Sequence, residues 1–111
     1  MTIRIGEKIL ADKVRPANRF FERLIGLMGK EQLDENEGLL LFHCSSIHCF
    51  FMKFTIDAVY LSTNWKVLGA ETLKPWEIGR IVKGAKHVLE LKAGSTAGRV
   101  AVGDILEIDS L

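Results

Sequence analysis

The sequence predicts a single β-rich α+β domain over residues 1–111, with antiparallel strands in a barrel-like sheet and one N-terminal helix. Three observations lead to this prediction. Short apolar runs recur between glycine-containing turns, one apolar pattern at helical spacing follows Pro16, and 111 residues suit one domain but not two. Hydrophobic residues make up 48% of the chain and charged residues 26%, which are ordinary values for a globular domain.

The first elements expected are a hairpin and a helix. Residues 2–11 alternate polar and apolar side chains on either side of a Gly6-Glu7 turn, which indicates two short strands. Pro16 suits the first turn of a helix, because its missing N–H would have no partner there. An amphipathic helix should follow and end near Gly26 and Gly29. Its apolar side is expected to consist of Phe20, Phe21, Leu24, Ile25 and Met28.

The remaining elements are expected to be strands, because each is an apolar or alternating run bounded by turn residues. Residues 65–73 should pair with residues 56–61 in a second hairpin across Thr63-Asn64. Pro75 lacks the N–H that a sheet requires, so residues 74–79 should form a loop or an edge. The expected strands are 39–42, 48–54, 56–61, 65–73, 81–82, 87–91 and 105–108.

Charge and composition exclude several classes of protein. The formal net charge is +1 and the basic residues are scattered, so no nucleic-acid partner is expected. No apolar segment approaches the roughly 20 residues that cross a bilayer, and the first residues do not form a signal peptide, so we expect no membrane partner and a cytoplasmic protein. The two cysteines, Cys44 and Cys49, are expected to be reduced thiols.

The stretch from Cys44 to Leu61 is the part of the sequence most suited to a binding site. It contains both cysteines and the only tyrosine in an otherwise apolar run, so its polar groups need partners. Asp57 could be a polar clamp that fixes the register of the hairpin, or it could belong to a pocket with an apolar floor. The candidate ligand-binding residues are Cys44, Ser46, His48, Phe50, Met52 and Asp57.

The same stretch could in principle carry metal or thiol chemistry. The spacing of its cysteines and histidines differs from the common zinc frameworks, so no metal and no other cofactor is expected. A nucleophilic pair of Cys44 and His48, oriented by Asp57, would need an activated thiolate, whereas the apolar neighbours favour an inert buried thiol. No catalytic residue is assigned.

The surroundings of Trp76 and Glu90 can also be predicted from the sequence. Trp76 follows Pro75 in the expected loop, which makes it the candidate residue for contact with a partner. Glu90 interrupts the apolar run of residues 88–91. The alternation of the strand allows Glu90 to lie on the solvent face, which is where we expect it.

Several blocks of the sequence resemble the domain of unknown function 192 family. They are residues 23–28 (RLIGLM), 38–41 (GLLL), 44–61 (CSSIHCFFMKFTIDAVYL), 88–94 (VLELKAG) and Gly103-Asp104. The resemblance implies a small β-rich domain with a helix near its start, and it implies no activity. The chain departs from the family pattern at Ser62, where an acidic residue is usual, and at Cys49, where threonine is usual.

The function expected from these observations is that of a non-enzymatic accessory domain that binds a small molecule or a peptide. One alternative is a small enzyme that uses Cys44 or Cys49 with His48. The other is a structural protein–protein interaction domain, with Trp76 and residues 75–79 on its contact surface.

Overall fold

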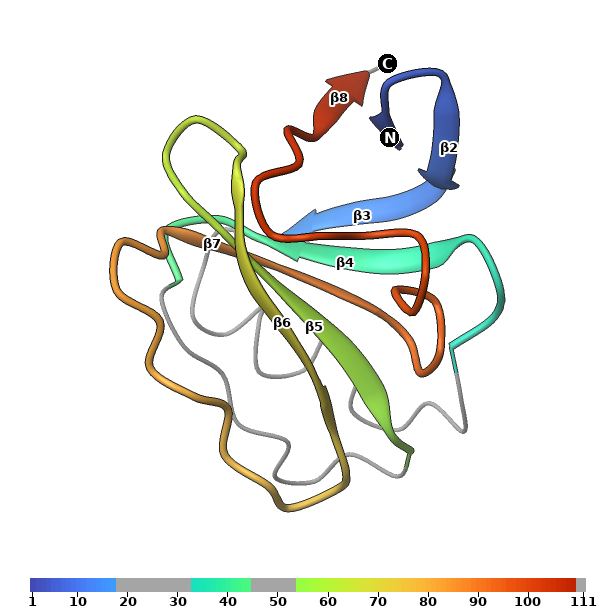
Figure 1. Cartoon of the computed structure of the whole chain (residues 1–111). Helices are drawn as coiled ribbons and strands as arrows, with labels where there is room; N and C mark the ends of the chain where they lie inside the picture. The colour runs from blue at the N-terminus through green and yellow to red at the C-terminus, as the bar shows by residue number, and fades with distance from the viewer. Residues whose placement is uncertain (18–32, 45–53, 110–111) are drawn as a thin grey trace.

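Eight strands in two sheets make up the part of the chain that the computed structural model describes, residues 1–17, 33–44 and 54–109 (Figure 1). The strands are β1 (Thr2–Ile5), β2 (Lys8–Ala11), β3 (Lys13–Ala17), β4 (Glu37–Leu41), β5 (Ile56–Leu61), β6 (Val67–Leu73), β7 (His87–Lys92) and β8 (Glu107–Asp109).

The smaller sheet joins the two ends of the described chain. Its strand order is β2-β1-β8, and both pairings are antiparallel. The β1–β2 hairpin is the one predicted from the alternation of residues 2–11. Across the other edge of β1, the Arg4 guanidinium lies 3.1 Å from Asp109 and 3.6 Å from Glu107, so an ion pair supports the pairing of the first strand with the last.

The larger sheet has the strand order β3-β4-β7-β5-β6. The β5–β6 hairpin was predicted, and the Ser62 hydroxyl stabilises its turn by accepting hydrogen bonds from the N–H groups of Asn64 and Lys66, each at 3.2 Å. β5 lies between β6 and β7, and all six of its residues are buried. A strand paired on both edges and apolar on both sides must be covered on both faces.

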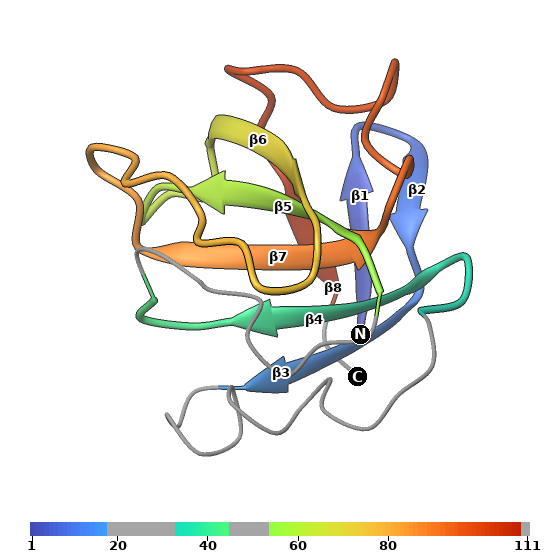
Figure 2. The same cartoon turned by 90° about the horizontal axis from the view of Figure 1, so that it is seen from below.

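The larger sheet separates two apolar cores. Ile56, Ala58 and Tyr60 point to one side, which we call the Tyr60 face, and pack with Leu39, Leu41 and Val88. The alternate residues of β5, including Val59 and Leu61, point to the other side, the Asp57 face. The smaller sheet covers the Asp57 face, because its Ile3 and Ala11 belong to the same core as Val59 (Figure 2).

The predicted fold class is wrong in its barrel, whereas the pairing is mostly antiparallel. The strands form two separate sheets, neither of which closes on itself, and β3 runs parallel to β4. Within residues 1–17, 33–44 and 54–109 there is no helix, and Pro16, expected in a first helical turn, pairs with Leu40 as part of β3. β3 is an edge strand, where a missing N–H is tolerated. The other residues of the expected helix, 18–29, lie outside the described residues.

Two further strand predictions have different outcomes. Residues 81–82 form no strand and belong to the loop between β6 and β7. Almost all of the strand expected at 48–54 lies outside the described residues. The described segments contain no helix that could span a lipid bilayer.

Candidate functional site

The structure locates three of the seven residues that the sequence singled out. Cys44 forms no disulfide, is half-buried, and packs against the core of the Tyr60 face. Asp57 lies on the opposite face of β5, so the sheet itself separates it from Cys44. Trp76 is 61% exposed in the β6–β7 loop. The other four candidates, Ser46, His48, Phe50 and Met52, lie outside the described residues.

Asp57 is a buried carboxylate with a full set of donors. It is 1% exposed and accepts a hydrogen bond from the Thr72 hydroxyl at 2.8 Å across the β5–β6 pair. Its second oxygen accepts from the N–H of Gly94 and from the N–H and hydroxyl of Thr96, at 3.0, 3.0 and 2.8 Å. These contacts fasten the turn after β7 to the hairpin, which is the geometry of a polar clamp.

Glu90 lies on the other face of the sheet and, in the described part of the chain, lacks the hydrogen-bond donors that surround Asp57. It is 5% exposed, and its carboxyl group has no hydrogen-bond or ion-pair partner among residues 1–17, 33–44 and 54–109. Burial raises the pKa of Glu90 to about 8. The group is therefore largely protonated at neutral pH, because its charged form would lose the solvation that water provides.

The prediction that Glu90 faces solvent is wrong, and a signal in the sequence could have shown it. Val88 points to the same side as Glu90, whereas Leu89 and Leu91 point to the other, and all three are buried. A strand that is apolar on both sides has no solvent face. The single acidic residue in such a strand is then a buried one.

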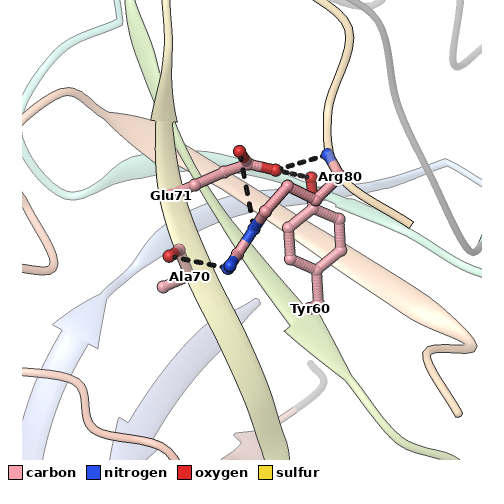
Figure 3. A network of polar contacts seen from close by, with 4 residues as sticks. All are labelled: Tyr60, Ala70, Glu71 and Arg80. Atoms are coloured by element: carbon pink, nitrogen blue, oxygen red, sulfur yellow. Dashed lines mark hydrogen bonds and ion pairs between the residues drawn. The ribbon is translucent and has the colours of Figure 1, made fainter. Parts of the chain in front are cut away.

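A network of polar contacts lies on the Tyr60 face, between β5, β6 and the β6–β7 loop (Figure 3). The Tyr60 hydroxyl donates to Glu71 Oε2 at 2.5 Å, and the Arg80 N–H donates to the same oxygen at 2.7 Å. The Arg80 side chain adds an ion pair, with Nε 3.7 Å from Glu71 Oε1, and a hydrogen bond from Nη2 to the carbonyl of Ala70 at 3.4 Å. Glu71 therefore connects the core residue Tyr60 to the β6–β7 loop.

Glu90 and Glu71 lie in one row across the sheet with only Ala58 between them. Ala58 pairs with Glu90 on one side and with Glu71 on the other. Two strand spacings place the two Cα atoms about 10 Å apart. Because alanine is small, little side-chain volume separates the uncharged carboxyl group of Glu90 from the ion-paired carboxylate of Glu71. Leu39 borders Glu90 on its other side.

A second polar group is buried at the start of β7. His87 is 6% exposed, and its ring stacks on Trp65 with 4.3 Å between centroids. Its Nδ1 accepts a hydrogen bond from the His43 N–H at 3.2 Å, so the neutral ring carries its proton on Nε2. Burial lowers the pKa of His87, and the nearby His43 lowers it further.

The described residues contain no group of three or more histidine, cysteine, aspartate or glutamate side chains that could hold a metal ion. Among the described residues, the polar groups on the Tyr60 face include one protonated carboxyl group, one ion-paired carboxylate, a tyrosine hydroxyl and the Cys44 thiol. Such groups recognise a polar ligand through hydrogen bonds and charge.

Comparisons with known proteins agree with the fold. Two crystal structures share it with a TM-score of 0.77. One is a Novosphingobium aromaticivorans protein of unknown function, at 19% identity over 86% of this chain and 74% of that one. The other is a Sinorhizobium meliloti protein described as a candidate transcription regulator, at 23% identity over 96% and 88%. At these identities the likeness concerns the fold alone.

Sequence relatives identify the family. A UPF0127 protein of Pyrococcus horikoshii is 36% identical over 81 residues, which are 70% of each chain. A UPF0127 protein of Pyrococcus abyssi is 34% identical over 99 residues, covering 86% of this chain and 85% of the relative. The model of the DUF192 family, described as an uncharacterized ACR, matches residues 1–108. The resemblance seen in the sequence is thus confirmed, and the chain belongs to the DUF192 family.

Proposed function

We propose that this protein binds a small ligand through Glu90 on the Tyr60 face, and that the ligand carries a positively charged nitrogen. The observation that supports the proposal is the burial of the Glu90 carboxyl group, which is 5% exposed and whose pKa burial raises to about 8. Among the described residues, no cation pairs with Glu90 to stabilise its charged form. A ligand that brings a positive charge would stabilise that form.

The charge of the ligand follows from the state of Glu90. A protonated carboxyl group with a pKa of about 8 becomes a strong acceptor once a cation stabilises its charged form. An ammonium or guanidinium group does this with short, charge-assisted hydrogen bonds. Binding then releases one proton from Glu90, so the affinity for an amine should rise as the pH approaches 8.

The two other charged residues in this cross-strand row are less suited than Glu90 to binding a cation. Arg15 on β3 is exposed and lies beyond Leu39, about 10 Å from Glu90 by two strand spacings. Glu71 lies at a similar distance, and its carboxylate is already engaged by Tyr60 and Arg80. Because Glu71 is already hydrogen-bonded through one oxygen and ion-paired through the other, we propose binding rather than acid–base catalysis between the two carboxyl groups.

The proposal is tested by measuring the melting temperature with a panel of primary amines from methylamine to spermidine. Matched panels of neutral sugars and of carboxylic acids serve as probes of the wrong charge. We expect at least one amine to raise the melting temperature of the wild type, more at pH 8 than at pH 6. Glu90→Gln, which keeps the shape of the side chain, should abolish the increase.

Glu7→Gln is the matched control, because Glu7 is exposed in the β1–β2 turn. It makes the same change from carboxyl to amide far from the row and should leave the response to amines intact. Stabilisation by sugars or acids but not by amines would contradict the proposal. So would a response to amines that survives in Glu90→Gln.

A further inference from the structure

The loop between β6 and β7, residues 74–86, carries exposed apolar side chains that have no role in the core. Trp76 is 61% exposed, Ile78 is 70% exposed and Ile81 is 91% exposed. The loop runs along the margin of the molecule, in gold and orange at the lower left of Figure 1. Single exposed apolar residues are common, but three within six positions of one loop indicate a contact surface.

Hydrogen bonds hold the backbone of this loop in place on both sides of its exposed isoleucines. The Lys74 N–H donates to Glu77 Oε1 at 2.6 Å, and the Glu77 N–H donates to the Lys74 carbonyl at 3.1 Å. Farther along, the Arg80 N–H is bonded to Glu71 at 2.7 Å, one residue before Ile81 (Figure 3). The Lys86 N–H donates to the carbonyl of Leu61 at 2.8 Å. Ile78 and Ile81 are therefore presented by a backbone fixed on both sides of them.

The exposed apolar side chains alternate with exposed cations. The cations are Lys74, Arg80, Lys83 and Lys86, and Glu77 is the one acidic residue of the loop. Four cations and one anion give the loop a net charge of +3, whereas the whole chain has +1, so the remaining residues carry −2. The loop therefore carries a net positive charge beside Ile78 and Ile81, the two most exposed isoleucines among the described residues, and its lysines supply most of that charge because Arg80 is paired with Glu71.

We infer that the loop docks on the surface of an anionic lipid bilayer. Reversible binding to a bilayer needs apolar side chains that enter the interface and cations that pair with anionic headgroups, and this loop presents both. Lysine is depleted in the cores of protein–protein interfaces, whereas here Lys74 and Lys83 flank the apolar residues. Docking by a loop requires no membrane-spanning segment, so the absence of one from the sequence, which led us to expect no membrane partner, does not oppose it.

Co-sedimentation with lipid vesicles tests this inference. The probes are vesicles of phosphatidylcholine alone and vesicles of phosphatidylcholine mixed with phosphatidylglycerol. The wild type should bind the anionic vesicles and not the neutral ones. Lys83→Gln and Lys86→Gln should each weaken binding about fivefold, the loss expected for one cation near an anionic surface. The double variant Ile78→Ser, Ile81→Ser should weaken it at least tenfold, since two aliphatic side chains no longer enter the interface.

Matched controls come from exposed apolar residues elsewhere. Val102 is 72% exposed and Ile105 is 50% exposed, and both lie outside the loop. Val102→Ser and Ile105→Ser should leave vesicle binding unchanged, and so should Glu90→Gln, which separates this inference from the proposed ligand site. Failure to bind anionic vesicles would overturn the inference, as would equal losses in the control variants. Binding of the loop to an acidic protein but not to vesicles would assign the surface to a protein partner instead.

Discussion

The three polar side chains buried most deeply in the described structure are stabilised in three different ways. Asp57 accepts four hydrogen bonds, His87 accepts one and stacks on an aromatic ring, and Glu90 takes up a proton. A residue that is fully satisfied, such as Asp57, serves the fold. Glu90 is instead protonated, so its carboxyl group remains able to bind a hydrogen-bond donor or a cation from a ligand.

Replacing Asp57 should show that it is structural. Asp57→Ala leaves the donors of Thr72, Gly94 and Thr96 without their acceptor in a buried position. We expect the free energy of unfolding to fall by about 3 kcal/mol, as measured by urea denaturation. Asp109→Ala, which removes an exposed carboxylate, should cost less than about 1 kcal/mol. Equal effects of the two substitutions would show that the clamp contributes little.

His87 should make the protein less stable in acid. Its pKa is lowered in the folded state, so between the unfolded-state value of 6.5 and the lower folded value the unfolded chain binds more protons. The free energy of unfolding should therefore fall as the pH drops below 6.5, by at most about 1.4 kcal/mol per pH unit. Denaturation curves of the wild type and His87→Gln isolate this contribution as their difference. A difference that does not change with pH would contradict it.

At the scale of elements, the sequence predicted strands best where the chain is regular. Residues 56–61 were predicted to the residue, and residues 87–91 missed only the last position of β7, because each is a short run between clear turn signals. β3 was missed because Pro16 favours both a first helical turn and an edge strand, and the local sequence does not distinguish them. The parallel β3–β4 pairing depends on contacts between distant segments, which no local pattern shows.

The pairing of β4 with β7 depends on Gly38. A Cβ atom at this position would lie 2.8 Å from Leu91 Cδ2 and 2.9 Å from the Glu90 carbonyl oxygen. Since the second neighbour is backbone in a central strand, it cannot move cheaply. Gly38→Ala should lower the free energy of unfolding by about 1–3 kcal/mol in urea denaturation.

The control for Gly38→Ala is Gly94→Ala. A Cβ atom there would meet nothing within 4 Å, but its φ of +90° disfavours other residues, so Gly94→Ala tests backbone strain without overpacking. It should cost about 1–2 kcal/mol. A Gly38→Ala protein as stable as the wild type would show that β4 and β7 can separate to admit a methyl group.

At the scale of the whole molecule, the candidate site depends on the topology. Glu90 is buried because β7 lies between β4 and β5, and this position in the sheet is set by long-range pairing. The sequence identified Asp57 as a residue in need of partners, and the structure provides them from Thr72, Gly94 and Thr96. It did not identify Glu90, Glu71 and Arg80 as neighbours, since the chain places them on β7, β6 and a loop.

The free energy of unfolding should depend on pH through the protonation of Glu90. Its pKa rises from an ordinary value of 4.5 to about 8 on folding, so between these values the folded state holds a proton that the unfolded chain releases. The free energy of unfolding should therefore decrease as the pH rises from 6.5 to 8, where His87 no longer contributes. The decrease should be absent in Glu90→Gln. A wild-type curve that is flat above pH 6.5 would contradict the assignment.

The protonation of Glu90 is tested most directly by a carbon-13 NMR titration of its carboxyl carbon, with the signal assigned by comparison with Glu90→Gln. We expect a midpoint near 8 in the free protein, because burial opposes ionisation. The midpoint should be lower when a binding amine is present. A midpoint near 4.5 in the free protein would show that Glu90 is solvated or paired, and the proposed binding site would lose its basis.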